Sequence, residues 1–116
     1  MKGRGFGDRL RYALAGLRDA YAAERSFRLQ LLAAVFAGGI VLWLRPPLFW
    51  AALIAVMIGL VLAAELVNAA LEHALDGLHP ERAEFVRIAK DCAAAAVLVL
   101  SITAVVVFVL MLAAVL

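Results

Sequence analysis

The chain has 116 residues, of which 67% are hydrophobic and only 17% are charged. A soluble domain of this length needs a polar exterior, and this sequence holds too few charged residues to supply one. The mean hydropathy of +1.03 and the long uncharged stretches indicate a bilayer instead. A single cysteine, Cys92, excludes an internal disulfide and a cysteine-based metal cluster, and two histidines are too few for a histidine zinc site.

The first stretch of the chain, about residues 1–25, is predicted to form an amphipathic helix lying in the membrane interface. Its apolar residues recur every three or four positions, which places them on one face while the arginines face the headgroups. They are Phe6, Leu10, Leu14, Leu17 and Tyr21. A basic juxtamembrane tail is the alternative interpretation. Because no early apolar run ends in a small-residue cleavage site, the first membrane span is expected to act as its own insertion signal.

Three apolar runs predict three transmembrane helices, and hence an all-α membrane protein with a single membrane domain over 1–116. Arg45-Pro46-Pro47 should end the first span, because proline lacks the backbone N–H and restricts the residue before it. The expected spans are 27–44, 48–76 with a cytoplasmic extension, and 91–116, with a cytoplasmic loop over 77–89 before the third span.

Basic residues predict the orientation of these spans. Lysines and arginines lie mainly before the first span and in the second loop, whereas only Arg45 lies in the first loop. The positive-inside rule therefore places the N-terminus and the second loop in the cytoplasm and the C-terminus outside.

Polar residues form one stripe on the second span. Glu65, Asn68, Glu72 and Asp76 recur every three or four positions, so they share one helical face. Ionisable groups at membrane depth are costly and usually face a protein interior or a cavity. A solvated helix end is the alternative, and it suits Asp76 better than Glu65, which directly follows the uncharged run from Leu48.

Such carboxylates predict two kinds of chemistry. They bind hard divalent cations, since Mg²⁺ often uses one or two carboxylates together with substrate phosphates. A carboxylate withdrawn from water can also serve as a general base. Glu24 should lie at a depth similar to that of Glu72 and could share a metal with it, while Lys90 could meet phosphate oxygens. The pattern alone therefore predicts an interfacial site for metal and phosphate chemistry. A non-catalytic scaffold or a cation-conducting subunit is the competing hypothesis.

The same residues resemble a known family. Glu65-Leu-Val-Asn68-Ala-Ala-Leu-Glu72, followed by Asp76 and by Ala89-Lys90-Asp91, is similar to the motif of the prokaryotic diacylglycerol kinases, a family that includes the undecaprenol kinases of Gram-positive bacteria. Glu24-Arg25-Ser26-Phe27-Arg28 resembles the first-helix motif of that family, and Tyr12 with Gly16-Leu17-Arg18 resembles its amphipathic helix. The resemblance covers essentially the whole chain.

The resemblance implies a homotrimer in the bacterial inner membrane, with active sites shared between neighbours. It implies phosphorylation of a lipid hydroxyl by ATP and Mg²⁺, on diacylglycerol or undecaprenol, and no nucleic-acid partner. By this resemblance Glu65 is the general base, and Glu24 and Glu72 coordinate the metal. The resemblance also implies which residues contact the two substrates. Those that would contact ATP are Tyr12, Glu24, Asn68, Glu72, Asp76, Lys90 and Asp91. Those that would contact the lipid are Arg18, Tyr21, Arg28, Trp43 and Glu65.

The chain also departs from the family pattern. Gln30 stands where some relatives carry an acid, and Gly5 where some carry an arginine. The Ala93–Ala96 run replaces a stretch richer in glycine and serine. The residues from Glu24 to Arg28 and from His79-Pro80 to Asp91 resemble the undecaprenol-kinase branch of the family more than the enteric diacylglycerol kinase. These departures concern particular ATP and lipid contacts rather than the metal and base residues.

Overall fold

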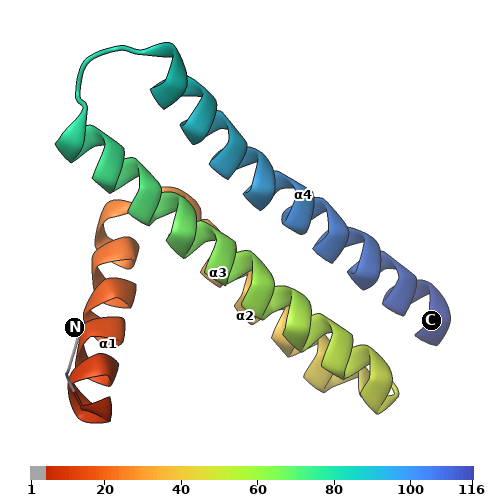
Figure 1. Ribbon diagram of the computed structural model, residues 1–116. Helices are drawn as coiled ribbons and strands as arrows, with labels where there is room; N and C mark the ends of the chain where they lie inside the picture. The colour runs from red at the N-terminus through yellow and green to blue at the C-terminus, as the bar shows by residue number, and fades with distance from the viewer. Residues whose placement is uncertain (1–4) are drawn as a thin grey trace.

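The computed structural model describes residues 5–116, which form four helices in chain order and no strand (Figure 1). This confirms the predicted all-α membrane fold. The first residues of the predicted interfacial helix, 1–4, lie outside the described part of the chain. The helices are α1 (Phe6–Ala23), α2 (Arg25–Leu44), α3 (Leu48–Leu78) and α4 (Glu84–Val115).

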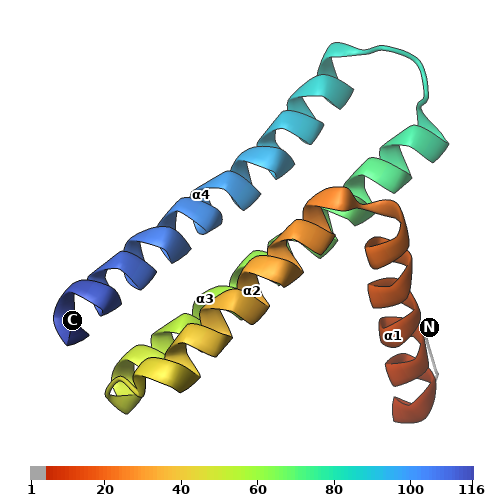
Figure 2. The ribbon, with the colours of Figure 1, turned by 180° about the vertical axis from the view of Figure 1, so that it is seen from behind.

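Helices α2, α3 and α4 are each long and apolar enough to cross a membrane, by their length and composition. They run up, down and up as a bundle (Figures 1 and 2). The 31 residues of α3 extend over about 46 Å, which is longer than a hydrocarbon core of ~30 Å. The second half of α3 therefore has the length to project beyond the apolar layer. We call the end where α2 begins, α3 ends and α4 begins the polar end of the bundle.

The connection between α3 and α4 is shorter than the sequence predicted. The expected loop covered 77–89, but α3 continues to Leu78 and α4 already begins at Glu84. Charged side chains stabilise these early turns of α4, because Arg87 forms ion pairs with Glu84 and with Asp91, the latter at 2.9 Å. Pairs at these helical spacings support a helix rather than a loop.

The predicted break between the first two spans is present. α2 ends at Leu44, and Arg45 adopts a left-handed conformation with φ 50° and ψ 56°. Pro46 and Pro47 follow, and α3 begins at Leu48. The two prolines cannot continue the helical hydrogen bonds of α2, so the chain reverses here.

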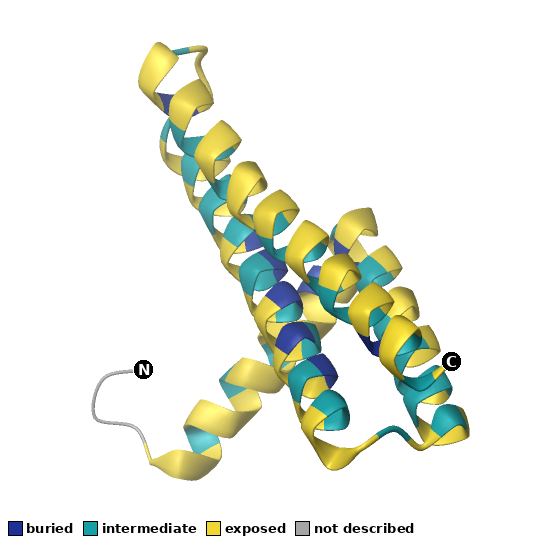
Figure 3. Ribbon diagram, turned by 90° about the vertical axis from the view of Figure 1, so that its right-hand side faces the viewer, coloured by how far each residue is buried: buried dark blue, intermediate teal, exposed yellow. Residues whose placement is uncertain are grey.

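Helix α3 is the centre of the bundle, and both α2 and α4 pack against it with little direct contact between themselves. Its buried residues recur every three or four positions and form a single stripe facing the other helices (Figure 3). They are Ile54, Met57, Val61, Glu65 and Ala69. Within residues 5–116, Glu65 is the one charged side chain in the buried core.

Helix α1 leaves the bundle at an angle to the other three (Figures 1 and 2). The break occurs at Glu24, whose backbone is extended, with φ −112° and ψ 106°. The guanidinium of Arg28 caps the end of α1 by donating hydrogen bonds to the carbonyl oxygens of Tyr21 and Ala22, at 2.7 and 3.2 Å. The apolar face of α1 remains exposed, as a helix lying on a membrane surface requires.

Candidate functional site

A buried carboxylate lies where α2 meets α3. Glu65 is only 3% exposed, and its Oε1 accepts a hydrogen bond from the Ser26 hydroxyl at 2.6 Å. Periodicity explains the burial, since Glu65 lies one turn from Val61 and one turn from Ala69 on the core-facing stripe of α3. Burying an ionisable group is costly unless it is paired, and such groups within membrane spans mark functional sites.

An unsatisfied amide lies next to this carboxylate along the stripe. The Oδ1 atom of Asn68 is buried and accepts no hydrogen bond from the described part of the chain. An unsatisfied buried acceptor costs about 1–3 kcal/mol. The position therefore calls for a hydrogen-bond donor or a cation from outside residues 5–116.

The helix break brings Glu24 close to α3. Its Oε1 lies 3.9 Å from Nδ1 of His73, the residue that follows Glu72 in the chain. His73 is held in place by its own helix, because Nδ1 is also 2.9 Å from the Ala69 carbonyl oxygen. Glu24 thus lies at the same level along the axis of α3 as Glu72, the neighbour of His73 in the chain.

The oxygen donors near the polar stripe are of the type that a hard divalent cation such as Mg²⁺ prefers. In the described residues no group of three or more Asp, Glu, His or Cys side chains is placed to hold a metal. Mg²⁺ does not require such a group, because it commonly takes one or two carboxylates, several waters and phosphate oxygens. Glu24 and Glu72, together with the unpartnered oxygen of Asn68, are oxygen donors of that kind.

At the polar end, a charged cavity of about 640 Å³ lies between the last turn of α3, the connection and the first turns of α4. Lys90 forms an ion pair with Asp76 across this junction, with Nζ 2.6 Å from Oδ1. Asp91 is held by Arg87 at 2.9 Å. The cavity is lined by Asp76, His79, Pro80, Glu81, Arg82, Ala83, Glu84, Val86, Arg87, Lys90 and Asp91. Its cations can contact phosphate oxygens, for which Arg and Lys are suited.

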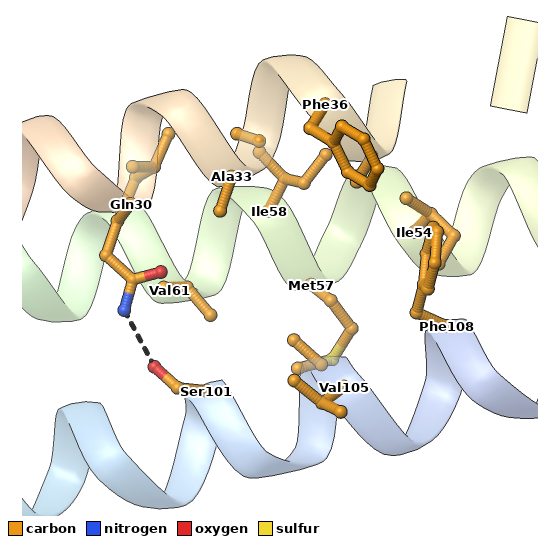
Figure 4. A pocket seen from close by; sticks show the side chains of 14 residues that line it. Gln30, Ala33, Phe36, Ile54, Met57, Ile58, Val61, Ser101, Val105 and Phe108 are labelled. Atoms are coloured by element: carbon orange, nitrogen blue, oxygen red, sulfur yellow. Dashed lines mark hydrogen bonds between the residues drawn. The ribbon is translucent and has the colours of Figure 1, made fainter. Parts of the chain in front are cut away.

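On the other side of Glu65, an apolar cavity of about 280 Å³ opens between α2, α3 and α4 (Figure 4). Side chains such as Met57, Val61 and Phe108 line it. Gln30 and Ser101 supply its polar groups, and the Gln30 Nε2 donates to the Ser101 Oγ at 2.9 Å. Val61 lies one turn along α3 from Glu65, so the cavity begins about one helical turn from the buried carboxylate, on the side away from the polar end.

The polar stripe of α3 joins these two cavities. Glu65 lies one helical turn from Val61 in the wall of the apolar cavity, and Asp76 lines the charged cavity, about 16 Å further along the helix axis. Asn68 and Glu72 lie between them on the same face. A long apolar molecule and a phosphate-bearing soluble molecule could therefore approach one stripe from opposite directions.

Several of the residues that the sequence analysis assigned to ATP or lipid lie away from this stripe. Tyr12 is half-buried on α1 with the Arg11 guanidinium 5.4 Å from its ring centre, and Arg18 is exposed beside Asp19. Tyr21 is exposed, and Arg28 is engaged in capping α1. Trp43 is 78% exposed near the far end of α2. Within one chain the structure does not bring these five residues to Glu65.

The sequence analysis gave no role to three side chains that the structure places at the site. They are Ser26, Arg87 and Ser101. Arg87 could have been found from its helical spacing to Glu84 and Asp91. The partners of Ser26 and Ser101 lie on other helices, 39 and 71 positions away, so no local pattern indicates them.

The fold and site define a small α-helical membrane protein with a buried acid between an apolar and a charged cavity. The family model for prokaryotic diacylglycerol kinase matches residues 11–112. The chain is 39% identical to a diacylglycerol kinase of Synechocystis over 84% of this chain and 56% of that protein, so it spans little more than half of that relative. It is 35% identical to the diacylglycerol kinases of Escherichia coli and Shigella flexneri, over 82% of this chain and 78% of theirs. The chain belongs to the prokaryotic diacylglycerol kinase family.

Proposed function

We propose that this protein is a lipid kinase that transfers the γ-phosphoryl group of ATP to the hydroxyl of a membrane lipid. The lipid would be diacylglycerol, giving phosphatidic acid, or undecaprenol, giving undecaprenyl phosphate. One observation carries the proposal: a single stripe on α3 runs from a buried carboxylate one helical turn from an apolar cavity to a cavity at the polar end that is lined by both basic and acidic side chains. The similarity to proteins named as diacylglycerol kinases supports it.

The proposed reaction needs little covalent chemistry from the protein. The lipid hydroxyl oxygen attacks the γ-phosphorus of ATP, its proton passes to Glu65, and the bond from the γ-phosphorus to the bridging oxygen breaks to release ADP. Phosphoryl transfer depends mainly on positioning and on stabilisation of the phosphate charge. A carboxylate that is buried and hydrogen-bonded to Ser26 is well placed for the base role, since it is rigid and shielded from bulk water.

The other assignments follow the stripe towards the polar end. Asn68, Asp76, Lys90 and Asp91 would position ATP, with Tyr12 near the base. Mg²⁺, bound by Glu24 and Glu72, would supply positive charge to the phosphate oxygens of ATP. The proposed lipid contacts are Arg18, Tyr21, Arg28 and Trp43, together with Glu65.

We further propose that the protein is a homotrimer in the bacterial inner membrane, with its N-terminus in the cytoplasm and its C-terminus outside. Support comes from the basic N-terminal segment and second loop, and from the exposed apolar faces of all three long helices. Residues of α1 that lie away from Glu65 in one chain could meet the site of a neighbour. The mass of the protein in detergent, measured by light scattering, tests the trimer.

The decisive experiment uses the purified full-length protein in detergent or lipid mesophase. ATP and Mg²⁺ are supplied with short-chain diacylglycerol or a polyprenol, and the phosphorylated lipid is quantified. Glu65→Gln should lower turnover by about 10²–10⁴-fold, the contribution typical of a general base. Asp19→Asn, a carboxylate-to-amide change on the exposed face of α1, should leave turnover unchanged. Full activity of Glu65→Gln would show that Glu65 is not the general base. Cation flux into liposomes without lipid phosphorylation would overturn the proposed kinase function.

A further inference from the structure

The apolar cavity beside Glu65 contains one polar pair, Gln30 on α2 and Ser101 on α4 (Figure 4). All the other residues lining this cavity are apolar, among them Ile54, Met57, Val61 and Phe108. Polar side chains at membrane depth are costly and tend to be functional. The pair therefore needs an explanation that the apolar lining does not provide.

The pair does not join two tightly packed helices. Both α2 and α4 pack on α3, and the bond from Gln30 to Ser101 bridges the cavity between them. Thr103, on the same helix as Ser101, behaves differently, because its hydroxyl donates to the Val99 carbonyl of its own helix at 2.8 Å. The Ser101 hydroxyl instead turns to a partner on another helix.

The pair retains unused hydrogen-bond donors. A glutamine amide has two N–H groups and a hydroxyl has one O–H, and the bond between Gln30 and Ser101 uses a single N–H. Within residues 5–116 the second N–H of Gln30 and the O–H of Ser101 make no further hydrogen bond. An acceptor group entering the cavity could receive either of them.

The position of the pair relative to Glu65 is set by the helices. Gln30 lies four residues beyond Ser26 on α2, which is a rise of about 6 Å away from the bond between Ser26 and Glu65. Val61 and Leu62, which also line the cavity, lie about one turn from Glu65 on α3. The pair is thus one helical turn deeper than the carboxylate, a distance that the few bonds between the free hydroxyl and the ester carbonyls of a diacylglycerol can span.

We propose that Gln30 and Ser101 form a specificity site that donates a hydrogen bond to an ester carbonyl of the lipid whose hydroxyl lies at Glu65. This inference rests on the proposed function and assigns its substrate class, an ester-linked glycerolipid. A polyprenol has no carbonyl at that depth, so it would leave the donors without an acceptor. Without lipid, the two side chains partly satisfy each other.

The test compares two lipids that differ only at the proposed contact. The full-length protein is assayed with dioctanoylglycerol and with the dioctyl ether of glycerol, which keeps the hydroxyl and the chain length but lacks the carbonyls. A polyprenol is the third substrate. We expect kcat/KM for the ester to exceed that for the ether about ten-fold, the effect of one hydrogen bond. Gln30→Leu and Ser101→Ala should reduce this ratio to about two-fold or less by lowering ester turnover alone.

Thr103→Val is the matched control, because it removes a hydroxyl from the same helix outside the cavity lining. It should keep the ester preference of the parent protein. A purely structural role for the pair would lower the unfolding temperature and the turnover of both lipids equally, leaving the ratio unchanged, and that result would overturn the proposal. Equal turnover of ester and ether by the parent protein would also overturn it while leaving the kinase proposal intact. Absence of turnover on all three lipids would overturn both.

Discussion

The hydroxyl of Ser26 donates a 2.6 Å hydrogen bond to Oε1 of Glu65, which ties the first turn of α2 to the middle of α3. Oε2 of the carboxylate makes no hydrogen bond to residues 5–116. One oxygen is therefore held in place while the other remains available to a substrate hydroxyl. Ser26 would act as a positioning residue for the proposed base, because it orients the carboxylate without contacting the reacting atoms itself.

Ser26→Ala should lower kcat about ten-fold or more while leaving the KM for ATP unchanged. A hydrogen bond to a charged group contributes roughly 1.5–3 kcal/mol, and its loss frees the buried carboxylate to rotate. Ser26→Thr keeps the hydroxyl and should retain most of the activity. Steady-state kinetics with varied ATP and varied lipid separate the two parameters. An Ala variant with a lower unfolding temperature but an unchanged kcat would assign the bond to stability alone.

Glu24→Gln and Glu72→Gln should each shift the Mg²⁺ activation curve to higher concentrations. The change removes a charged oxygen donor but keeps the size of the side chain, so the helix break at Glu24 and the packing of α3 should persist. Mg²⁺ titration at a fixed total ATP concentration measures the shift, which we expect to be roughly 10–100-fold, the range for losing a group that supports a metal site. Asp8→Asn, on α1 beside Arg11, should leave the curve in place. Unshifted curves for both glutamate variants would contradict the proposed metal role.

Much of the fold could be predicted from local patterns. The uncharged runs and Arg45-Pro46-Pro47 indicated the spans and the first turn, since length and proline chemistry act within a single segment. The start of α4 was placed too late, because Glu84, Arg87 and Asp91 suggest a polar loop unless their helical spacing is counted. Charged residues end an apolar run, but they do not end a helix.

The site was predictable along one helix and unpredictable between helices. Periodicity placed Glu65 and Asp76 on one face, and the unusual depth of Glu65 marked it as functional. The contacts of Glu65 with Ser26 and of Gln30 with Ser101 depend on how α2 and α4 rest against α3. That arrangement follows from packing of the whole bundle, which spacing along one segment does not encode.

Arg28→Ala should loosen the end of α1. The Arg28 guanidinium donates to the carbonyls of Tyr21 and Ala22, which no helical N–H can satisfy once the chain breaks at Glu24. Without this cap, the last turn of α1 should exchange its amide hydrogens several-fold faster, as expected for a loss of about 1 kcal/mol. Hydrogen exchange read by mass spectrometry on peptides from this turn measures the effect. Arg18→Ala is the control, because it removes an arginine of α1 itself without touching the cap. Equal acceleration in both variants would argue against a capping role for Arg28.

Lys90→Met should weaken the use of ATP more than the use of lipid. Lys90 lines the charged cavity and is held there by Asp76, with Nζ 2.6 Å from Oδ1, so its charge is already oriented before a nucleotide arrives. A charge-assisted contact to phosphate contributes about 1.5–3 kcal/mol, which corresponds to a roughly 10–100-fold loss in kcat/KM for ATP. Asp76→Asn should produce a smaller loss of the same kind, because the ammonium group keeps its charge but loses its fixed position.

Arg45→Asn is the matched control for Lys90→Met. It also removes one positive charge, but at the opposite end of the bundle, and asparagine tolerates the left-handed conformation of that position. Its kcat/KM for ATP should equal that of the parent protein. Equal losses in the two variants would mean that net charge, rather than a contact in the charged cavity, governs ATP use. A loss confined to Lys90→Met, with the KM for lipid unchanged, is the result that the ion pair with Asp76 leads us to expect.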